Sequence, residues 1–99
     1  MAPASMQSLW IDTDMGFDDL AAVLTVAAQP GWQIAGMSLV AGNAPLAVVT
    51  DNALRAARCF GWAFPIHAGC AQPLACPLVT AQDILGDDAM RSAGRQLPP

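Results

Sequence analysis

The sequence predicts an α/β fold in which an open parallel sheet, with the element order β-α-β-α-β, is followed by a long irregular loop. Three short apolar runs alternate with two longer segments whose apolar residues recur at helical spacing. Apolar residues make up 55% of the 99 residues, which indicates strands and helices that are covered on their faces. A chain of this length holds one domain at most, and its high apolar content suits a part of a larger unit or an associating subunit.

The elements follow one another without long gaps. A strand is expected over residues 8–12, and a helix is expected over 18–31, where a Pro-Gly pair ends the apolar repeat. A second strand is expected over 32–40. The helix expected over 45–61 has a proline suited to its first turn and a glycine suited to its end. A third, short strand is expected over 64–69.

The last third of the chain has no sustained period. Prolines and glycines interrupt residues 70–99, so we expect a long loop with at most one helical turn. The sequence therefore predicts one domain over 1–99, ordered over about 8–69 and loop-rich beyond.

Charge and cysteine content argue against several classes of partner. The net charge is −4 and the pI is about 4.3, which disfavours nucleic-acid binding. Cys59, Cys70 and Cys76 fit no zinc or redox spacing and are typical of reduced thiols in a cytosolic protein. The sequence shows neither a secretory signal nor an apolar run long enough to span a membrane. We therefore expect a cytoplasmic protein without a membrane partner.

Four of the eight acidic residues, Asp12, Asp14, Asp18 and Asp19, fall within eight positions. The first two close the first strand, and ligands of open α/β sheets bind beyond the carboxyl ends of strands. The other two open the next helix, where the helix dipole favours negative charge. A helix cap with a first-turn acid accounts for one or two carboxylates, but not for four.

Converging carboxylates repel one another, or hold a proton, unless a cation lies among them. Because every candidate ligand is a hard oxygen, the pattern favours Ca²⁺ or Mg²⁺ over Zn²⁺. The helical calcium-loop pattern does not apply: with Asp12 as its first position, Gly16 is fifth instead of sixth, and Val23 stands where a Glu is required. A metal site and a purely structural acidic turn both remain open at this point.

The acidic stretch DTDMGFDD, residues 12–19, resembles the N-terminal signature of the inosine-uridine-preferring nucleoside hydrolases, Asp-x-Asp-Pro-Gly-x-Asp-Asp. The resemblance extends from about Leu9 to Leu97 and implies a Rossmann-like nucleoside hydrolase core, of which this chain is the N-terminal third. The other blocks that resemble the family, in the same order, are VAGN (40–43), DNALRAARCFG (51–61), PIHAGCAQPL (65–74) and DILGDDAM (83–90).

The resemblance implies calcium-dependent hydrolysis of the N-glycosidic bond of ribonucleosides, giving ribose and a free base, as in nucleoside salvage. Asp14 is similar to the catalytic carboxylate that binds Ca²⁺ and takes a proton from the attacking water, and Asp19 to a bidentate calcium ligand. Asp18 is similar to a residue that binds a ribose hydroxyl, and Asp12 to a buried supporting acid. Asn43 resembles the catalytic and substrate-binding asparagine beside the metal. A full-length member is expected to be a homo-oligomer.

The chain departs from the family pattern at several points. Met15 replaces a proline, which we expect to loosen the turn without removing a ligand. Leu85 replaces a histidine of some members and Ala89 a common glycine, so base preference stays open. Family members run to about 300 residues, and their remaining calcium ligands and a catalytic histidine come later. The resemblance therefore implies that this chain carries the N-terminal half of the site.

Two alternatives remain open. A haloacid-dehalogenase-like phosphohydrolase also has Asp-x-Asp after its first strand, with Mg²⁺ and a nucleophile that would here be Asp12; Asp18 and Asp19 favour the nucleoside hydrolase instead. The second alternative is a truncated, non-catalytic metal-binding fragment. Calcium-dependent ribose release and magnesium-dependent phosphatase activity distinguish the three.

Overall fold

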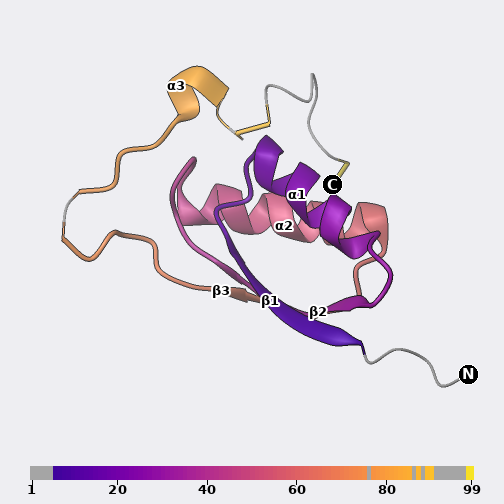
Figure 1. The fold of residues 1–99 in the computed structure, drawn as a ribbon. Helices are drawn as coiled ribbons and strands as arrows, with labels where there is room; N and C mark the ends of the chain where they lie inside the picture. The colour runs from indigo at the N-terminus through magenta and orange to yellow at the C-terminus, as the bar shows by residue number, and fades with distance from the viewer. Residues whose placement is uncertain (1–5, 76, 86, 88, 91–97) are drawn as a thin grey trace, which may run out of the picture.

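The computed structural model describes residues 6–75, 77–85, 87, 89–90 and 98–99. Within these residues, three parallel strands form one sheet in the order β1-β2-β3, and two long helices connect them (Figure 1). The predicted α/β class, with a β-α-β-α-β order and an irregular segment behind it, is confirmed. The elements are β1 (Gln7–Thr13), α1 (Phe17–Ala27), β2 (Trp32–Leu39), α2 (Leu46–Phe60), β3 (Ile66–Ala68) and the short α3 (Gln82–Leu85).

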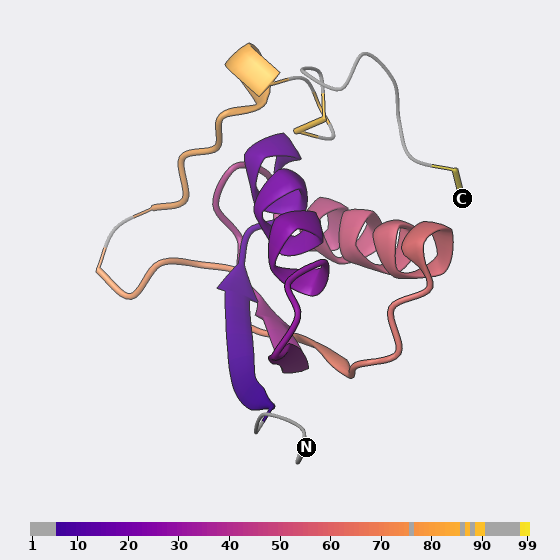
Figure 2. The same cartoon turned by 45° about the vertical axis from the view of Figure 1, so that its right-hand side comes forward.

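Helices α1 and α2 lie on the same face of the sheet (Figures 1 and 2). Right-handed crossovers between neighbouring parallel strands require this arrangement when the strands follow one another in sequence order. Side chains of β1 alternate accordingly: Thr13 is buried beneath the helices, whereas Trp10 is 54% exposed on the other face. No described helix covers that second face.

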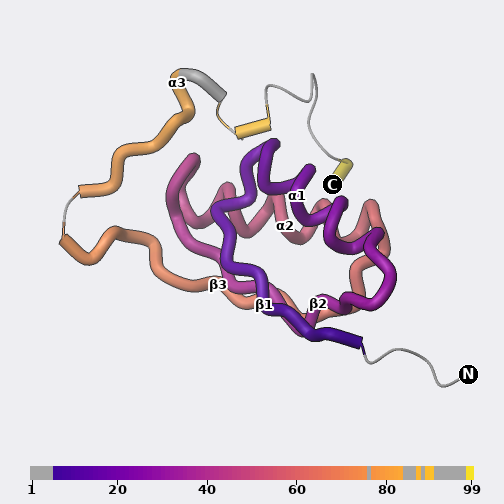
Figure 3. The backbone as a smooth tube through the Cα atoms, in the orientation of Figure 1, coloured from indigo at the N-terminus to yellow at the C-terminus, as the bar shows by residue number. Residues whose placement is uncertain are grey.

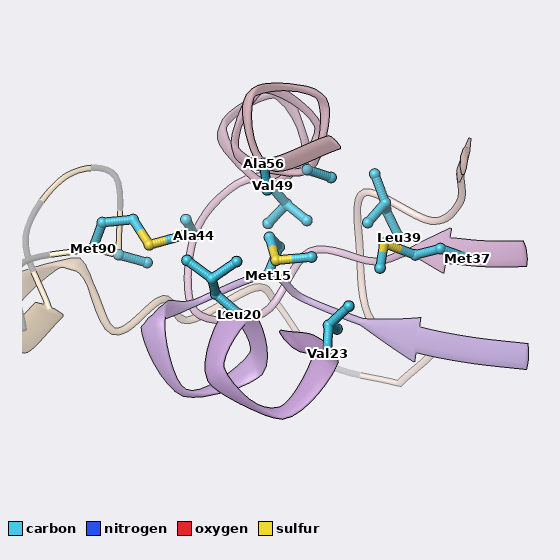
Figure 4. Close-up of a cluster of buried hydrophobic side chains, with 11 residues drawn as sticks. Met15, Leu20, Val23, Met37, Leu39, Ala44, Val49, Ala56 and Met90 are labelled. Atoms are coloured by element: carbon cyan, nitrogen blue, oxygen red, sulfur yellow. The ribbon is translucent and has the colours of Figure 1, made fainter. Parts of the chain in front are cut away.

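The hydrophobic core lies between the sheet and the two long helices. Met15, from the turn after β1, is completely buried between Leu20 of α1 and Val49 of α2 (Figure 4). The apolar stripe of α2 includes a polar residue, Asn52, which is only 4% exposed. The buried apolar residues are Met15, Leu20, Val23, Met37, Leu39, Ala44, Val49, Ala53, Ala56, Ala89 and Met90.

The irregular segment after β3 returns to the sheet edge at two points. The amide of Ala81 donates to the carbonyl of Asn43 across 3.0 Å, and the amide of Phe17 donates to the carbonyl of Ala89 across 3.1 Å. Met90 reaches the core. The segment thereby covers the start of α1 and the loop before α2. None of the described helices is long and apolar enough to cross a membrane.

Candidate active site

Two loops meet at the carboxyl edge of the sheet, where β1 turns into α1 and β2 leads into α2 (Figure 3). The amide of Asn43 donates to Oδ2 of Asp14 across 2.8 Å. The amide of Val40 donates to the carbonyl of Thr13 across 3.1 Å, which extends the strand pairing into the loops. The structure thus brings together Asp14 and Asn43, which the sequence places 29 positions apart.

Two glycines leave room for these polar groups. A Cβ atom on Gly42 would lie 2.4 Å from Oδ2 of Asp14, and one on Gly16 would lie 2.5 Å from Nδ2 of Asn43. Real Cβ atoms do not approach other atoms so closely, so both positions require glycine while the site groups keep their places. Gly42 therefore shapes the site by leaving room for the Asp14 carboxylate.

Asp18 and Asp19 lie in the first turn of α1, as predicted. Oδ2 of Asp19 accepts the amide of Gly16 across 3.2 Å, which satisfies one of the free donors at the helix start. The carboxyl group of Asp19 is also hydrogen-bonded to that of Asp14. Asp18 is exposed to solvent beside them. Three of the four acids of the cluster therefore gather at one edge.

This concentration of negative charge changes the titration of Asp19. Burial raises its pKa to about 6, and the hydrogen bond with Asp14 and the charges of Asp14 and Asp18 act in the same direction. The hydrogen bond from the Gly16 amide acts in the opposite direction, because it favours the carboxylate. An ionised Asp19 is thus costly at this point of the fold, and a cation bound there would offset that cost.

The donor groups suit a hard cation, but they are few. Asp14 and Asp19 offer carboxylate oxygens in mutual contact, the ligand type that Ca²⁺ prefers. Among the described residues, no group of three or more His, Cys, Asp or Glu side chains is arranged to hold a metal. Because Ca²⁺ takes six to eight oxygens, two carboxylates make up only part of a calcium site.

Asp12 lies apart from this group and is exposed in this structure, whereas the resemblance implies a buried acid; its supporting role stays a prediction. Asp12 is exposed on the sheet face away from the helices, because side chains alternate along β1. Its Oδ1 accepts the hydroxyl of Ser38 across 2.7 Å, and the hydroxyl oxygen accepts the indole N–H of Trp10 across 3.1 Å. His67 stacks on Trp10 at a ring-centroid distance of 5.9 Å.

The turn at Met15, which the sequence predicts to be loosened by the loss of a proline, has hydrogen bonds at both the amide and the carbonyl of that residue. Met15 has φ +40°, a conformation that the fixed ring of proline excludes. Its amide donates to Oγ1 of Thr13 across 3.0 Å, and its carbonyl accepts Nδ2 of Asn52 across 3.2 Å. Sequence reasoning did not identify Thr13 or Asn52; the available signal was a polar residue within the apolar stripe of the second helix.

A family model described as inosine-uridine preferring nucleoside hydrolase matches residues 9–99. The chain belongs to this family.

Two named relatives of this chain support its assignment to the nucleoside hydrolase family. The chain is 38% identical over 81 residues to the inosine-uridine preferring nucleoside hydrolase of Crithidia fasciculata, which covers 81% of the chain and 26% of the relative. It is 34% identical over 80 residues to the non-specific ribonucleoside hydrolase RihC of Klebsiella pneumoniae (strain 342), with coverage of 81% and 26%. The chain spans about a quarter of the length of these relatives.

A solved structure of similar fold carries the name inosine-guanosine nucleoside hydrolase. The two chains superpose with a TM-score of 0.81 at 27% sequence identity, over 93% of this chain and 28% of the other. The resemblance stated from the sequence is thereby confirmed for the family and for the fold.

Proposed function

We propose that this chain provides part of the active site of a calcium-dependent nucleoside hydrolase, which cleaves the N-glycosidic bond of ribonucleosides to ribose and a free base. The observation that carries the proposal is the convergence of Asp14, Asp19 and Asn43 at the carboxyl edge of the parallel sheet. Family membership supports the same reaction, and the relatives whose names state an activity are hydrolases of nucleosides.

Asp14 is the proposed general base. Its Oδ2 accepts the Asn43 amide, which holds the carboxylate at the sheet edge where it would take a proton from the attacking water. Asp19, in contact with Asp14, is the second proposed calcium ligand. When bound, Ca²⁺ would supply positive charge that acidifies and orients that water.

The proposed sugar contacts lie beside this pair. Asp18 is exposed next to Gly16 and is free to accept a hydrogen bond from a ribose hydroxyl. The side-chain amide of Asn43 lies against the same glycine and can donate to the substrate. Because the transition state of glycosidic cleavage is oxocarbenium-like, the nearby carboxylates would also stabilise its developing positive charge.

The other two interpretations receive less support. A phosphohydrolase with Asp12 as nucleophile disagrees with the family match and with the position of Asp12 on the uncovered sheet face, bonded to Ser38. A non-catalytic chain that only binds metal is favoured by one observation, the small number of converging ligands within the described residues. The experiment below separates it from the hydrolase.

Three further properties belong to the proposal. We propose that the chain serves purine or pyrimidine salvage. We also propose a cytoplasmic location, where nucleoside substrates would be available. The sheet face around the exposed Trp10, which no described helix covers (Figure 1), is compatible with the homo-oligomer expected for a full-length member.

Ribose release from inosine and uridine tests the proposal. The purified chain is assayed with Ca²⁺ and with chelator, beside Asp14→Asn and the control Asp51→Asn. The control makes the same chemical change at an exposed acid of α2 that pairs with Arg55, at 2.8 Å. We expect calcium-dependent release that Asp14→Asn lowers by at least about a hundredfold and that Asp51→Asn leaves unchanged.

Two other results would each support one of the alternative interpretations. A chain that is folded by circular dichroism and binds Ca²⁺, yet releases no ribose, would be the non-catalytic metal-binding protein. Magnesium-dependent hydrolysis of p-nitrophenyl phosphate, abolished by Asp12→Asn, would support the phosphohydrolase instead.

A further inference from the structure

We propose that Asn52 of α2 is a positioning residue for the acidic site: it fixes the Met15–Gly16 peptide, and that peptide orients the carboxylate of Asp19. The part of this inference that concerns calcium rests on the proposed function. The part that concerns the peptide rests on the geometry of the chain alone.

One planar peptide unit connects the two groups. Its carbonyl, from Met15, accepts Nδ2 of Asn52 across 3.2 Å, and its N–H, from Gly16, donates to Oδ2 of Asp19 across 3.2 Å. Because the C=O and N–H of a trans peptide point in opposite directions within one plane, holding the carbonyl also aims the N–H. A rotation of this peptide would remove the hydrogen-bond donor from Asp19.

The peptide needs to be held, because its first residue is strained. Met15 has φ +40°, and a residue with a side chain pays about 1–2 kcal/mol for a left-handed conformation. Such a conformation persists only where the surroundings fix it. Here the Met15 side chain is fully buried, its amide is bound by Thr13, and its carbonyl is bound by Asn52.

The position of Asn52 in α2 indicates a side chain held by polar contacts, of which the one to Met15 reaches the acidic turn. Asn52 is 4% exposed and lies next to the buried Ala53, on the stripe that also carries Val49 and Ala56. A polar side chain buried among apolar residues is costly unless it forms hydrogen bonds. The contact to Met15 spans 37 positions of sequence and joins α2 to the centre of the acidic turn.

The consequence for the site is the orientation of a proposed metal ligand. The Gly16 N–H donates to Oδ2 of Asp19 across 3.2 Å and so fixes the direction in which that carboxylate points. Asn52 therefore acts on Asp19 through a peptide, in the way that outer groups around a metal orient its ligands.

The test compares Asn52→Ala with Ala56→Gly, one turn further along the same buried stripe. The control lowers stability by helix propensity, about 1 kcal/mol, and removes neither hydrogen bond of the Met15–Gly16 peptide. In the calcium-free chain, NMR hydrogen exchange of the Gly16 amide should become about tenfold faster in Asn52→Ala than in the control. In calorimetric titration, Asn52→Ala should bind Ca²⁺ about tenfold more weakly than the control.

A second variant tests the mechanism. Glycine adopts positive φ without strain, so in a Met15→Gly background the effect of Asn52→Ala on Gly16 exchange should shrink markedly. If Asn52→Ala alone fails to fold, recovery of folding in the double variant supports the proposal, and failure of both overturns it. Equal Gly16 exchange in Asn52→Ala and Ala56→Gly also overturns it. A natural chain that binds no Ca²⁺ contradicts the proposed function, while the exchange measurement still decides the role of Asn52.

Discussion

The backbone amide of Asn43 donates to Oδ2 of Asp14 across 2.8 Å, so the loop after β2 holds the carboxylate that follows β1. This contact is possible because Gly42 has no side chain: a Cβ there would lie 2.4 Å from the same oxygen. The loop after β2 therefore sets the orientation of Asp14, the proposed general base.

Gly42→Ala should therefore displace Asp14. We expect calcium affinity to fall about tenfold and stability to fall by about 1–3 kcal/mol through overpacking, measured by calorimetry and urea unfolding. Gly31→Ala is the matched control, because its added methyl group meets no atom within 4 Å, while its φ of +84° costs about 1 kcal/mol. Equal calcium affinity in the two variants would contradict the displacement of Asp14.

The raised pKa of Asp19 predicts how stability depends on pH. The pKa rises from 3.8 to about 6 on folding, so the folded chain holds this proton more tightly than the unfolded chain. The resulting stabilisation is fully present below pH 3.8 and is lost as pH rises through 6. At pH 7 the ionised group therefore destabilises the metal-free fold.

Asp19→Asn should consequently stabilise the chain at pH 7 in chelator, by on the order of 1 kcal/mol after solvent screening. The difference from the natural chain should become small near pH 3, where Asp19 is mostly protonated in both the folded and the unfolded chain. Urea unfolding at both pH values measures it. A destabilised variant at pH 7 would show that Asp19 is not under electrostatic strain.

Sequence patterns predicted the elements well, because apolar periodicity and Pro-Gly punctuation are local signals. The resemblance to the nucleoside hydrolases implied that Asp14 and Asn43 both lie beside the metal, and the structure brings the two residues together. Sequence patterns did not predict the exposure of Asp12, which depends on which face the helices cover. Nor did they predict the hydrogen bond to the Met15 carbonyl, because its donor, Asn52, is 37 positions away in the sequence.

Met15 gives a prediction that opposes the family pattern. Met15→Pro would install the residue of the family signature, yet proline cannot adopt φ +40° and cannot donate to Thr13. Because a buried side chain is lost as well, we expect a cost of at least about 3 kcal/mol in the free energy of unfolding. Met15→Leu keeps the volume and should cost less than about 1.5 kcal/mol. A stable Met15→Pro variant would mean that the turn readily takes another conformation.

Thr13 and Asp12 are neighbours on opposite faces of β1. Removing the Thr13 hydroxyl should therefore change stability more than removing the Asp12 charge. Thr13→Val keeps the branched shape but leaves the buried Met15 amide without its acceptor, which should cost about 1–3 kcal/mol. Asp12→Asn removes an exposed charge and keeps an oxygen for the Ser38 hydroxyl, so it should change stability by less than about 0.5 kcal/mol. Urea unfolding of both variants at pH 7 compares the two faces directly. A larger loss for Asp12→Asn would show that the face carrying Trp10 is covered in solution, because only a buried carboxylate would contribute that much.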